Sequence, residues 1–164
     1  MDDTRDALQQ AYAGEAKACL RLKVYAQKAE EDGYPQVARL FRVIARSEEI
    51  HGARALTALR EVKTTEENLA ESFQSEQGVA EVAYADFVRR AESEGNRSAA
   101  IFFRQSKDVE ETHAKLYKEA MNHLMAERET EYYVCLVCGY VADGIRPDIC
   151  PVCGAKEDRF QRFA

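Results

Sequence analysis

The sequence lacks tryptophan and any low-complexity run, and no apolar stretch approaches the length of a membrane span. Its first residues contain no apolar h-region, so they do not resemble a secretory signal peptide. What remains is the composition of a globular protein, with 46% apolar and 32% charged residues. We expect a cytoplasmic protein of one ordinary domain plus a small appendage, because 164 residues leave little room for more.

The chain also lacks an excess of positive charge, since its net charge is −6 and its isoelectric point lies near 5.2. This balance argues against a nucleic-acid partner and against an anionic membrane surface. Cysteine is absent from most of the chain. Four of the five cysteines cluster near the C-terminus in metal-ligand spacing, and Cys19 stands alone in a predicted helix. We therefore expect no disulfide framework.

Apolar periodicity predicts four long helices, over residues from about 4 to 32, 35 to 61, 65 to 94 and 97 to 126. Gly33 and Gly95 mark helix ends, and Pro35 fits the first position of the second helix. Thr64 and Glu67 form a capping-box start for the third helix. We expect this helical domain to cover residues 1–131 and a small second domain to cover residues 132–164.

Two copies of the motif Glu-x-x-His lie in the second and fourth predicted helices, each with a further glutamate on the preceding helix. Side chains three residues apart lie one turn apart on the same helix face, so a carboxylate and an imidazole can bind one metal ion. One such motif alone would be read as a polar pair on a solvated face. Two such motifs, each with a glutamate on the preceding helix, match the ligand pattern of a di-iron or di-manganese carboxylate bundle. The six candidate ligands are Glu15, Glu48, His51, Glu76, Glu110 and His113.

The two halves of the helical part resemble a repeat. Glu48 and Glu110 are separated by 62 residues (110 − 48), whereas Glu15 and Glu76 are separated by 61 (76 − 15). The second half therefore holds one extra residue between its glutamate and Gly95. A π-bulge absorbs one inserted residue in a helix, so we predict a π-bulge in the third helix, downstream of Glu76.

The four clustered cysteines form two Cys-x-x-Cys pairs, Cys135 with Cys138 and Cys150 with Cys153. Two such pairs close a tetrahedral site of four sulfurs, which by geometry alone binds zinc or iron. A structural zinc ribbon is the alternative to a redox site. The short segment cannot build much of a core, so the metal must supply part of the folding energy. We expect the amide after the second cysteine of each pair to donate to sulfur.

The pattern Cys-x-x-Cys-Gly-Tyr followed by Cys-Pro-x-Cys-Gly resembles rubredoxin, and a di-iron helical bundle ahead of it resembles rubrerythrin. The resemblance covers essentially the whole chain. It implies a ferritin-like four-helix bundle over residues 1–131 and a rubredoxin-like domain over residues 132–164. It also implies two non-haem irons and one rubredoxin-type iron per chain. Further matching positions are Ala13–Glu15, Asn68–Leu69, Ser75–Glu76, Tyr84 before Phe87, and Glu94–Gly95.

The resemblance implies a non-haem peroxidase that reduces hydrogen peroxide to water and protects the cell against oxidants. Electrons would enter from reduced rubredoxin or an NAD(P)H-dependent reductase and pass through the four-cysteine iron. Glu48 and Glu110 would bridge the two irons. Tyr84 would bond a ligand carboxylate, with a core aromatic as its alternative role. Cys19 is expected as a small buried hydrophobe and His123 as a surface residue.

Two positions depart from the family pattern. Val79 stands where the family commonly has a further glutamate, so the site keeps six ligands unless Glu81 reaches in through the bulge. Leu22 stands where the family often has a tyrosine. The change at Val79 makes oxygen reduction or iron oxidation a competing activity. A protein that only binds iron or carries electrons is a further alternative.

The link between the second and third helices predicts how the chain assembles. In a ferritin-like bundle these helices run parallel, so the link must travel the length of the bundle. Residues 62–64 are too short for that distance. We therefore predict a homodimer that exchanges helix pairs, with its hinge between residues 61 and 66. Each site would take its first three ligands from one chain and its last three from the other.

Overall fold

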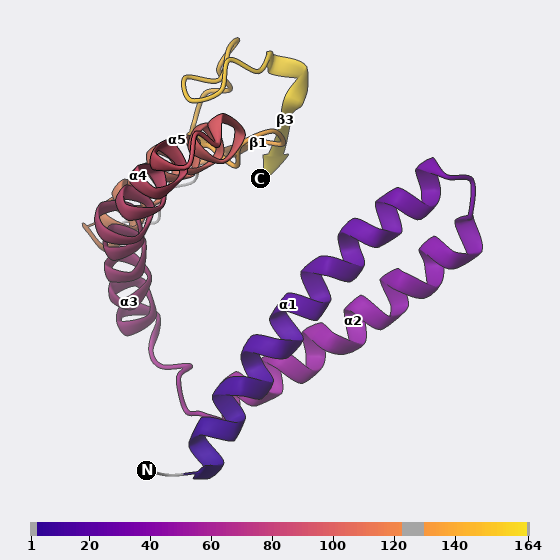
Figure 1. The fold of residues 1–164 in the computed structure, drawn as a ribbon. Coiled ribbons are helices and arrows are strands. Elements are labelled where there is room, and N and C mark those ends of the chain that lie inside the picture. Colours follow the sequence, from indigo (N-terminus) through magenta and orange to yellow (C-terminus); the bar gives the residue numbers. More distant parts are fainter. Residues whose placement is uncertain (1–2, 123–129, 164) are drawn as a thin grey trace. The chain divides into compact units, whose positions relative to one another are not determined.

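The computed structural model describes residues 3–122 and 130–163 and consists of two compact units, Met1–Lys63 and Thr64–Ala164 (Figure 1). The division falls within residues 61–66, the predicted hinge. His123 and the predicted end of the last long helix lie outside the described residues. Within residues 3–122 and 130–163, no helix combines the length and the apolar character that a membrane crossing requires.

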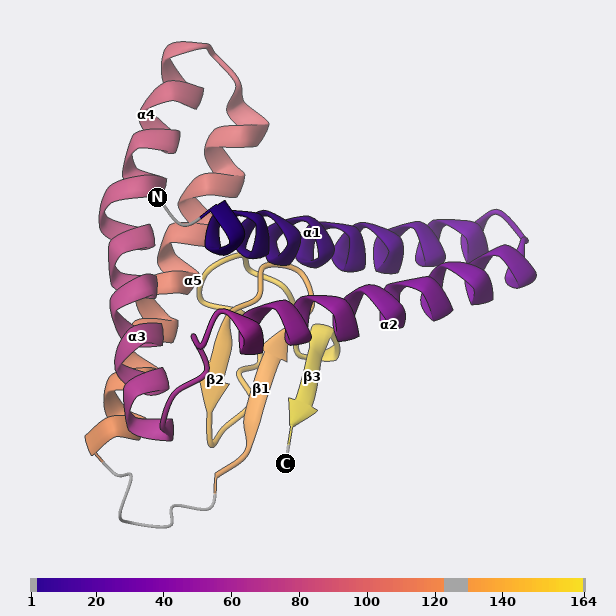
Figure 2. The ribbon, with the colours of Figure 1, turned by 90° about the horizontal axis from the view of Figure 1, so that it is seen from below.

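The first unit is a helical hairpin of α1 (Asp3–Glu31) and α2 (Pro35–Ala58), which lie side by side in both views (Figures 1 and 2). The reversal between them needs a left-handed residue, which Gly33 supplies with a φ of 80°. The N–H of Tyr34 then donates to the Ala29 carbonyl at 2.8 Å, which closes the end of α1. Gly33 therefore ends the first helix, as predicted.

The end of α2 differs from the prediction. The helix was expected to reach about Glu61, but it ends at Ala58. Arg60 adopts a left-handed backbone conformation, with a φ of 58°, and its N–H donates to the Thr57 carbonyl at 3.0 Å. Arg5 of α1 holds the following residue, because its guanidinium donates to the Glu61 carboxylate at 3.0 Å. The link between the units therefore begins three residues earlier than predicted (61 − 58).

Small residues form the seam of the hairpin. Small side chains let two helices approach closely, but they bury little apolar area. Larger apolar side chains stay exposed in this unit, for example Leu20 at 66% and Val43 at 61%. The hairpin alone thus leaves apolar surface that other helices can cover. The buried residues of α1 and α2 are Cys19, Ala26, Ala29, Ala38, Ala45, Gly52 and Ala55.

The second unit begins with three consecutive helical segments, α3 (Thr65–Gly78), the π-helix η1 (Val79–Tyr84) and α4 (Ala85–Ser93). The π-helix lies directly downstream of Glu76, so the predicted π-bulge is confirmed. It accommodates the extra residue of the second half. After a turn at Gly95, which has a φ of 67°, α5 (Arg97–Asn122) packs along all three segments.

The predicted capping box is present at the start of α3. The Thr64 hydroxyl accepts from the Glu67 N–H at 3.2 Å, and the Glu67 carboxylate accepts from the Thr64 N–H at 3.1 Å. These bonds satisfy two backbone donors that the first turn of a helix leaves without intrahelical partners. The box fixes the point where the link from α2 must end.

The C-terminal part of the second unit is a small antiparallel sheet in the order β2-β1-β3 (Figure 2). A 3₁₀ turn, η2 (Glu157–Arg159), leads into the last strand. In this C-terminal part, the most buried large side chains are Cys135 and Cys150, at 1% and 2% exposure. Sulfur atoms therefore occupy the place where a hydrophobic core would be. This agrees with a fold that depends on its metal. The strands are β1 (Tyr132–Cys135), β2 (Val141–Asp143) and β3 (Phe160–Phe163).

Replacing Thr64 by alanine removes the hydroxyl of the capping box and should lower the free energy of unfolding by about 1 kcal/mol. Thr65→Ala is the matched control, because Thr65 lies inside the helix and is not the cap residue. Chemical denaturation at one protein concentration measures both differences. Equal effects in the two variants would show that the capping box contributes nothing.

Candidate metal centres

The first metal-ligand cluster lies in the α1–α2 hairpin and consists of Glu15, Glu48 and His51, whose ligand atoms all lie within 4.8 Å of one another. His51 Nδ1 is 3.3 Å from Glu48 Oε2 and 3.9 Å from Glu15 Oε1. The two helices come close at Gly52, because a Cβ there would stand 3.5 Å from Glu15 Cβ. The close approach brings the carboxylate of α1 against the Glu-x-x-His motif of α2.

The two carboxylates of this cluster face each other. A hydrogen bond to Glu48 raises the pKa of Glu15, and the same bond lowers the pKa of Glu48. The opposite shifts show that the two carboxylates are close enough to compete for one proton. A multivalent cation compensates the same pair more strongly, so the cluster suits a metal ion.

The second cluster combines Glu76 of α3 with Glu110 and His113 of α5, again with all ligand atoms within 4.8 Å. His113 Nδ1 is 3.0 Å from Glu110 Oε2. This cluster is more enclosed, since 25% of the His113 side chain is exposed against 51% for His51. Burial, followed by the hydrogen bond to Glu110, raises the pKa of Glu76 to about 7.

The two clusters are chemically alike. Each combines a glutamate from one helix with a Glu-x-x-His motif from the next, and each belongs to a different unit of the chain. The structure thus brings the six predicted residues together in two groups of three. Two such groups together have the ligand number and type of a di-iron carboxylate bundle.

Glu81 does not join the second cluster. Its side chain is exposed on η1 and accepts a hydrogen bond from Gln77 Nε2 at 3.1 Å. Glu81 lines a pocket with Glu111 and Lys115, which is a different face of the helix pair from Glu76. The π-helix therefore does not bring Glu81 to the place that Val79 leaves without a carboxylate.

Tyr84 lies in an aromatic cluster. Its ring meets Phe87 edge-on at a centroid distance of 5.8 Å and lies 6.2 Å from Phe103. Within the described residues, its hydroxyl has no hydrogen bond to a carboxylate of either cluster. Cys19 is buried, at 8% exposure, and does not belong to the cluster around Glu15.

The four cysteines of the C-terminal module converge on one point. All four sulfurs lie within 4.8 Å of one another, with Cys135 Sγ 3.7 Å from Cys153 Sγ and Cys138 Sγ 3.6 Å from Cys150 Sγ. Each cysteine pair sits in a tight backbone turn. In the turn of the first pair, the Cys135 N–H donates to the Tyr140 carbonyl at 2.8 Å. This is the arrangement of a tetrahedral thiolate site.

The amide donors to sulfur differ from those predicted. The N–H groups of Gly139 and Gly154 donate to cysteine carbonyls instead, each at 2.9 Å. Both glycines have a positive φ, of 84° and 74°, which turns the next amide toward the sulfur. The donors are therefore one residue further on, Tyr140 to Cys138 and Ala155 to Cys153. Burial raises the pKa of both thiols, and these amide hydrogen bonds oppose that rise by favouring the thiolates.

One contact joins the second cluster to the cysteine module and was not predicted. His113 Nε2 lies 3.4 Å from the carbonyl oxygen of Gly139, the residue that follows Cys138. The two partners are separated by 26 residues in sequence, so no local pattern could indicate the contact.

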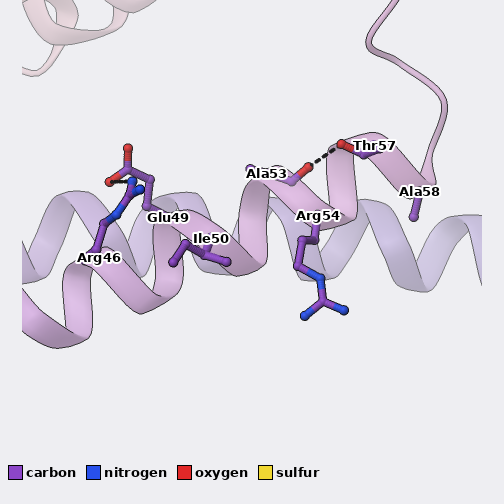
Figure 3. A pocket seen from close by; sticks show the side chains of 7 residues that line it. All are labelled: Arg46, Glu49, Ile50, Ala53, Arg54, Thr57 and Ala58. Atoms are coloured by element: carbon purple, nitrogen blue, oxygen red, sulfur yellow. Dashed lines mark hydrogen bonds and ion pairs between the residues drawn. The ribbon is translucent and has the colours of Figure 1, made fainter.

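A pocket on the outer surface of α2 has no comparable set of ligands (Figure 3). Within it, Arg46 forms an ion pair with Glu49 at 3.1 Å, and the Thr57 hydroxyl donates to the Ala53 carbonyl at 2.9 Å. Glu48 and His51 do not line it. The metal-ligating face of α2 is therefore distinct from this pocket.

Cys150→Ser should remove the sulfur-bound metal, because it takes one thiolate from the four-sulfur site and leaves both Glu–His clusters intact. Cys19→Ser is the control, since Cys19 is a buried cysteine outside that site. Iron analysis and the visible absorption of iron-thiolate bonds measure the loss. Retention of the thiolate absorption in Cys150→Ser would contradict the assignment.

Two family models match the chain. The model described as rubrerythrin matches residues 6–121, and the model described as the rubredoxin-like domain of rubrerythrin matches residues 133–161. Rubrerythrin-2 of Clostridium acetobutylicum is 29% identical, over 98% of this chain and 96% of its own length. Nigerythrin of Nitratidesulfovibrio vulgaris is 30% identical, over 98% of this chain and 86% of its own.

Solved structures of nigerythrin give the same result. The partially reduced state is 30% identical, with a TM-score of 0.61, and the likeness covers 99% of this chain and 88% of that chain. The fully reduced, all-ferrous state is 29% identical with the same TM-score and coverage. The predicted fold class, a ferritin-like helical bundle with a small rubredoxin-like region, is confirmed.

The donor sets fit the metals that this likeness implies. Four thiolates suit a tetrahedral iron, and carboxylates with imidazoles suit a di-iron centre. With family models matched over most of its length, this chain belongs to the rubrerythrin family. It is an iron-dependent oxidoreductase of a family that acts in oxidative stress, with di-iron residues in its helical part and a rubredoxin-like four-cysteine site.

Proposed function

We propose that this protein is a non-haem peroxidase that reduces hydrogen peroxide to water at a di-iron centre. The observation that carries the proposal is the presence, in one chain, of two matched clusters, each with two carboxylates and one imidazole, and of a four-cysteine site. The proposed ligands are Glu15, Glu48, His51, Glu76, Glu110 and His113 for the two irons, and Cys135, Cys138, Cys150 and Cys153 for the third.

In this proposal Glu48 and Glu110 would be the carboxylates that both metal ions share, because each lies close to the histidine and the second glutamate of its own cluster. The imidazole Nδ1 atoms of His51 and His113 complete the ligand set. When bound, the di-iron group supplies the two electrons that break the peroxide bond. The protein's part is to hold the carboxylates and imidazoles in place and to admit peroxide and protons.

We further propose that Cys135, Cys138, Cys150 and Cys153 would hold an iron that could supply single electrons to the di-iron group. The family suggests reduced rubredoxin or an NAD(P)H-dependent reductase as the donor. Amide hydrogen bonds to the Cys138 and Cys153 sulfurs support this role, because such bonds favour the charged thiolate and tune the potential of an iron-thiolate site. We also propose that the protein acts in the cytoplasm. We propose that the di-iron domain ends at residue 131 and that the rubredoxin-like domain begins at residue 132.

We also propose that two chains exchange helix pairs to form the site. From Glu48 to Ala58 and from Thr65 to Glu76 the helices rise by about 31 Å in total at about 1.5 Å per residue. The seven steps from Ala58 to Thr65 span at most about 25 Å when fully extended. The link is therefore too short for parallel second and third helices of one chain, even with the earlier end of α2.

The apolar surface of the α1–α2 hairpin supports the same proposal. This unit buries mainly alanine and leaves Leu20 and Val43 exposed, so it needs a second helix pair to complete a core. A partner chain can supply that pair with its own second cluster. Each di-iron centre would then have three ligands from one chain and three from its partner.

Oxygen reduction or iron oxidation is the second candidate function, and Val79 favours it. Val79 is half-buried one turn after Glu76 and offers no oxygen ligand, while Glu81 lies on another face. A site with six protein ligands resembles the ferritin-type oxidases that the sequence suggested as an alternative.

Stopped-flow oxidation of the fully reduced protein separates these functions. We expect peroxide to react faster than oxygen. Val79→Glu adds a carboxylate one turn after Glu76 and should increase the ratio of the two rate constants about tenfold in favour of peroxide. Val82→Glu is the control, because Val82 lies on the same π-helix but is 71% exposed. Faster oxidation of the wild type by oxygen would favour the second candidate.

A mixing experiment tests the exchange of helix pairs. One chain carries Glu48→Ala in the first cluster, and the other carries Glu110→Ala in the second. In an exchanged mixed dimer one site collects both defects and the other is intact. Equal amounts refolded together should therefore recover about a quarter of the wild-type activity, since half of the dimers are mixed.

The control for this experiment pairs Glu48→Ala with Glu15→Ala, which both damage the first cluster and restore nothing in either arrangement. If every site is built from one chain, mixing Glu48→Ala with Glu110→Ala gives no more activity than the single variants. That result would end the exchange proposal and leave the peroxidase proposal standing.

A further inference from the structure

The helices α1, α2 and α4 end in the same backbone motif, but α2 forms it without a glycine. The other two end at left-handed glycines, Gly33 with a φ of 80° and Gly95 with a φ of 67°. In α2 the left-handed residue is Arg60, with a φ of 58°, and the N–H of the next residue, Glu61, donates to the Leu56 carbonyl at 3.4 Å. A side chain disfavours this conformation, so the end of α2 needs support from elsewhere.

Arg5, in the first turn of α1, supplies that support from across the hairpin (Figure 1). Its Nη1 donates to the Leu59 carbonyl at 3.1 Å, and its Nη2 donates to the Glu61 carboxylate at 3.0 Å. The two acceptors lie directly before and after Arg60. Leu59 is also buried, at 3% exposure, so both its backbone and its side chain are held. We call these two bonds the Arg5 clamp.

The clamp fixes one end of the link between the two units. Glu61 is held by Arg5, and Thr64 is held by the capping box of α3. Only Val62 and Lys63 lie between these two points. The link is therefore short because the last turn of α2 and the first turn of α3 are both fastened.

The length of the link decides between two arrangements of the helices. With α2 ending at Ala58, the helices between Glu48 and Glu76 rise by about 31 Å, and the link spans at most about 25 Å. If the last turn of α2 unwound and the helix ended at Arg54, the rise would fall to about 26 Å. The eleven steps from Arg54 to Thr65 (65 − 54) would then span up to about 38 Å, which permits closure within one chain. One turn of α2 thus separates exchange from closure.

We propose that the Arg5 clamp selects the exchange of helix pairs by keeping the last turn of α2 helical. The inference rests on the exchange proposed above. Without the clamp, the left-handed Arg60 loses its support and the end of α2 unwinds into the link, as unsupported helix ends do. The second unit of a chain then covers its own hairpin, because a tethered unit has a far higher effective concentration than a second chain.

A mixing experiment that measures iron instead of activity tests this inference. Glu48→Ala and Glu110→Ala chains are refolded together and loaded with iron, and spin-coupled non-sulfur iron pairs are counted by Mössbauer spectroscopy. Exchange should restore about a quarter of the wild-type pairs. With Arg5→Ala added to both chains, we expect this recovery to fall at least about fivefold, because each closed chain keeps its own defect.

The matched control adds Arg42→Ala to both chains. Arg42 of α2 pairs with Glu30 of α1 at 2.6 Å, so it is also an arginine–glutamate bridge across the hairpin, but it lies near the Gly33 turn. Its loss should leave the recovery unchanged. Arg5→Ala in the otherwise wild-type chain should keep its full non-sulfur iron, since closure builds complete sites.

Arg60→Gly provides a rescue that a general loss of stability would not show. Glycine adopts a φ of 58° without the steric cost of a side chain, so it should hold the end of α2 without the clamp. Adding Arg60→Gly to the Arg5→Ala chains should restore the recovery to within about twofold of its original value.

An insertion of eight Gly/Ser residues between Val62 and Lys63 tests the length argument with the Arg5 clamp intact. It should abolish the recovery, because the longer link permits closure. Unchanged recovery in the Arg5→Ala pair or in the insertion pair would overturn the inference, and so would an equal fall with Arg42→Ala. No recovery in the original pair would instead end the exchange proposal itself.

Discussion

Opposed carboxylates are the constraint on which this structure depends. Glu15 faces Glu48 in one cluster and Glu76 faces Glu110 in the other. The hydrogen bond to Glu48 raises the pKa of Glu15, and burial followed by the hydrogen bond to Glu110 raises the pKa of Glu76. Such pairs repel unless a proton or a cation lies between them. A protein that places two of them beside histidines has therefore built sites that a metal ion completes.

The packing of the helices serves this constraint. Gly52 and the alanine seam let α1 approach α2 closely enough for Glu15 to meet the motif of the neighbouring helix. The same small residues bury little apolar area, so the hairpin gains little stability from its own seam. Close approach at the ligands and dependence on a second helix pair thus have a common cause. The cysteine module likewise buries little apolar surface, because the buried sulfurs of Cys135 and Cys150 stand where a core would be.

Features set by local spacing could be predicted from the sequence. The Glu-x-x-His motifs, the cysteine pairs and the capping box depend on residues a few positions apart, and the π-helix follows from one extra residue between the repeats. Features set by tertiary contacts could not. Arg60 ends α2 without a glycine to mark the position, and Tyr84 joins an aromatic cluster that spans two helices.

The errors have the same origin. The amides of Gly139 and Gly154 were expected to meet sulfur, but their left-handed conformations pass that role to the next residue. Whether Glu81 joins the site was left open by the sequence, because a bulge can rotate a side chain into a site, and the π-helix places Glu81 on another face. Sequence shows which residues can bind metal, whereas the backbone path decides which of them meet.

The central claim is that the two separate clusters converge on one di-iron centre. Mössbauer and electron paramagnetic resonance spectroscopy of the iron-loaded protein test this most directly, because two irons that share bridging carboxylates couple their spins. The account predicts an exchange-coupled pair with two non-sulfur irons per chain, beside one iron-thiolate signal. Isolated, uncoupled ferric ions outside the cysteine site would contradict it.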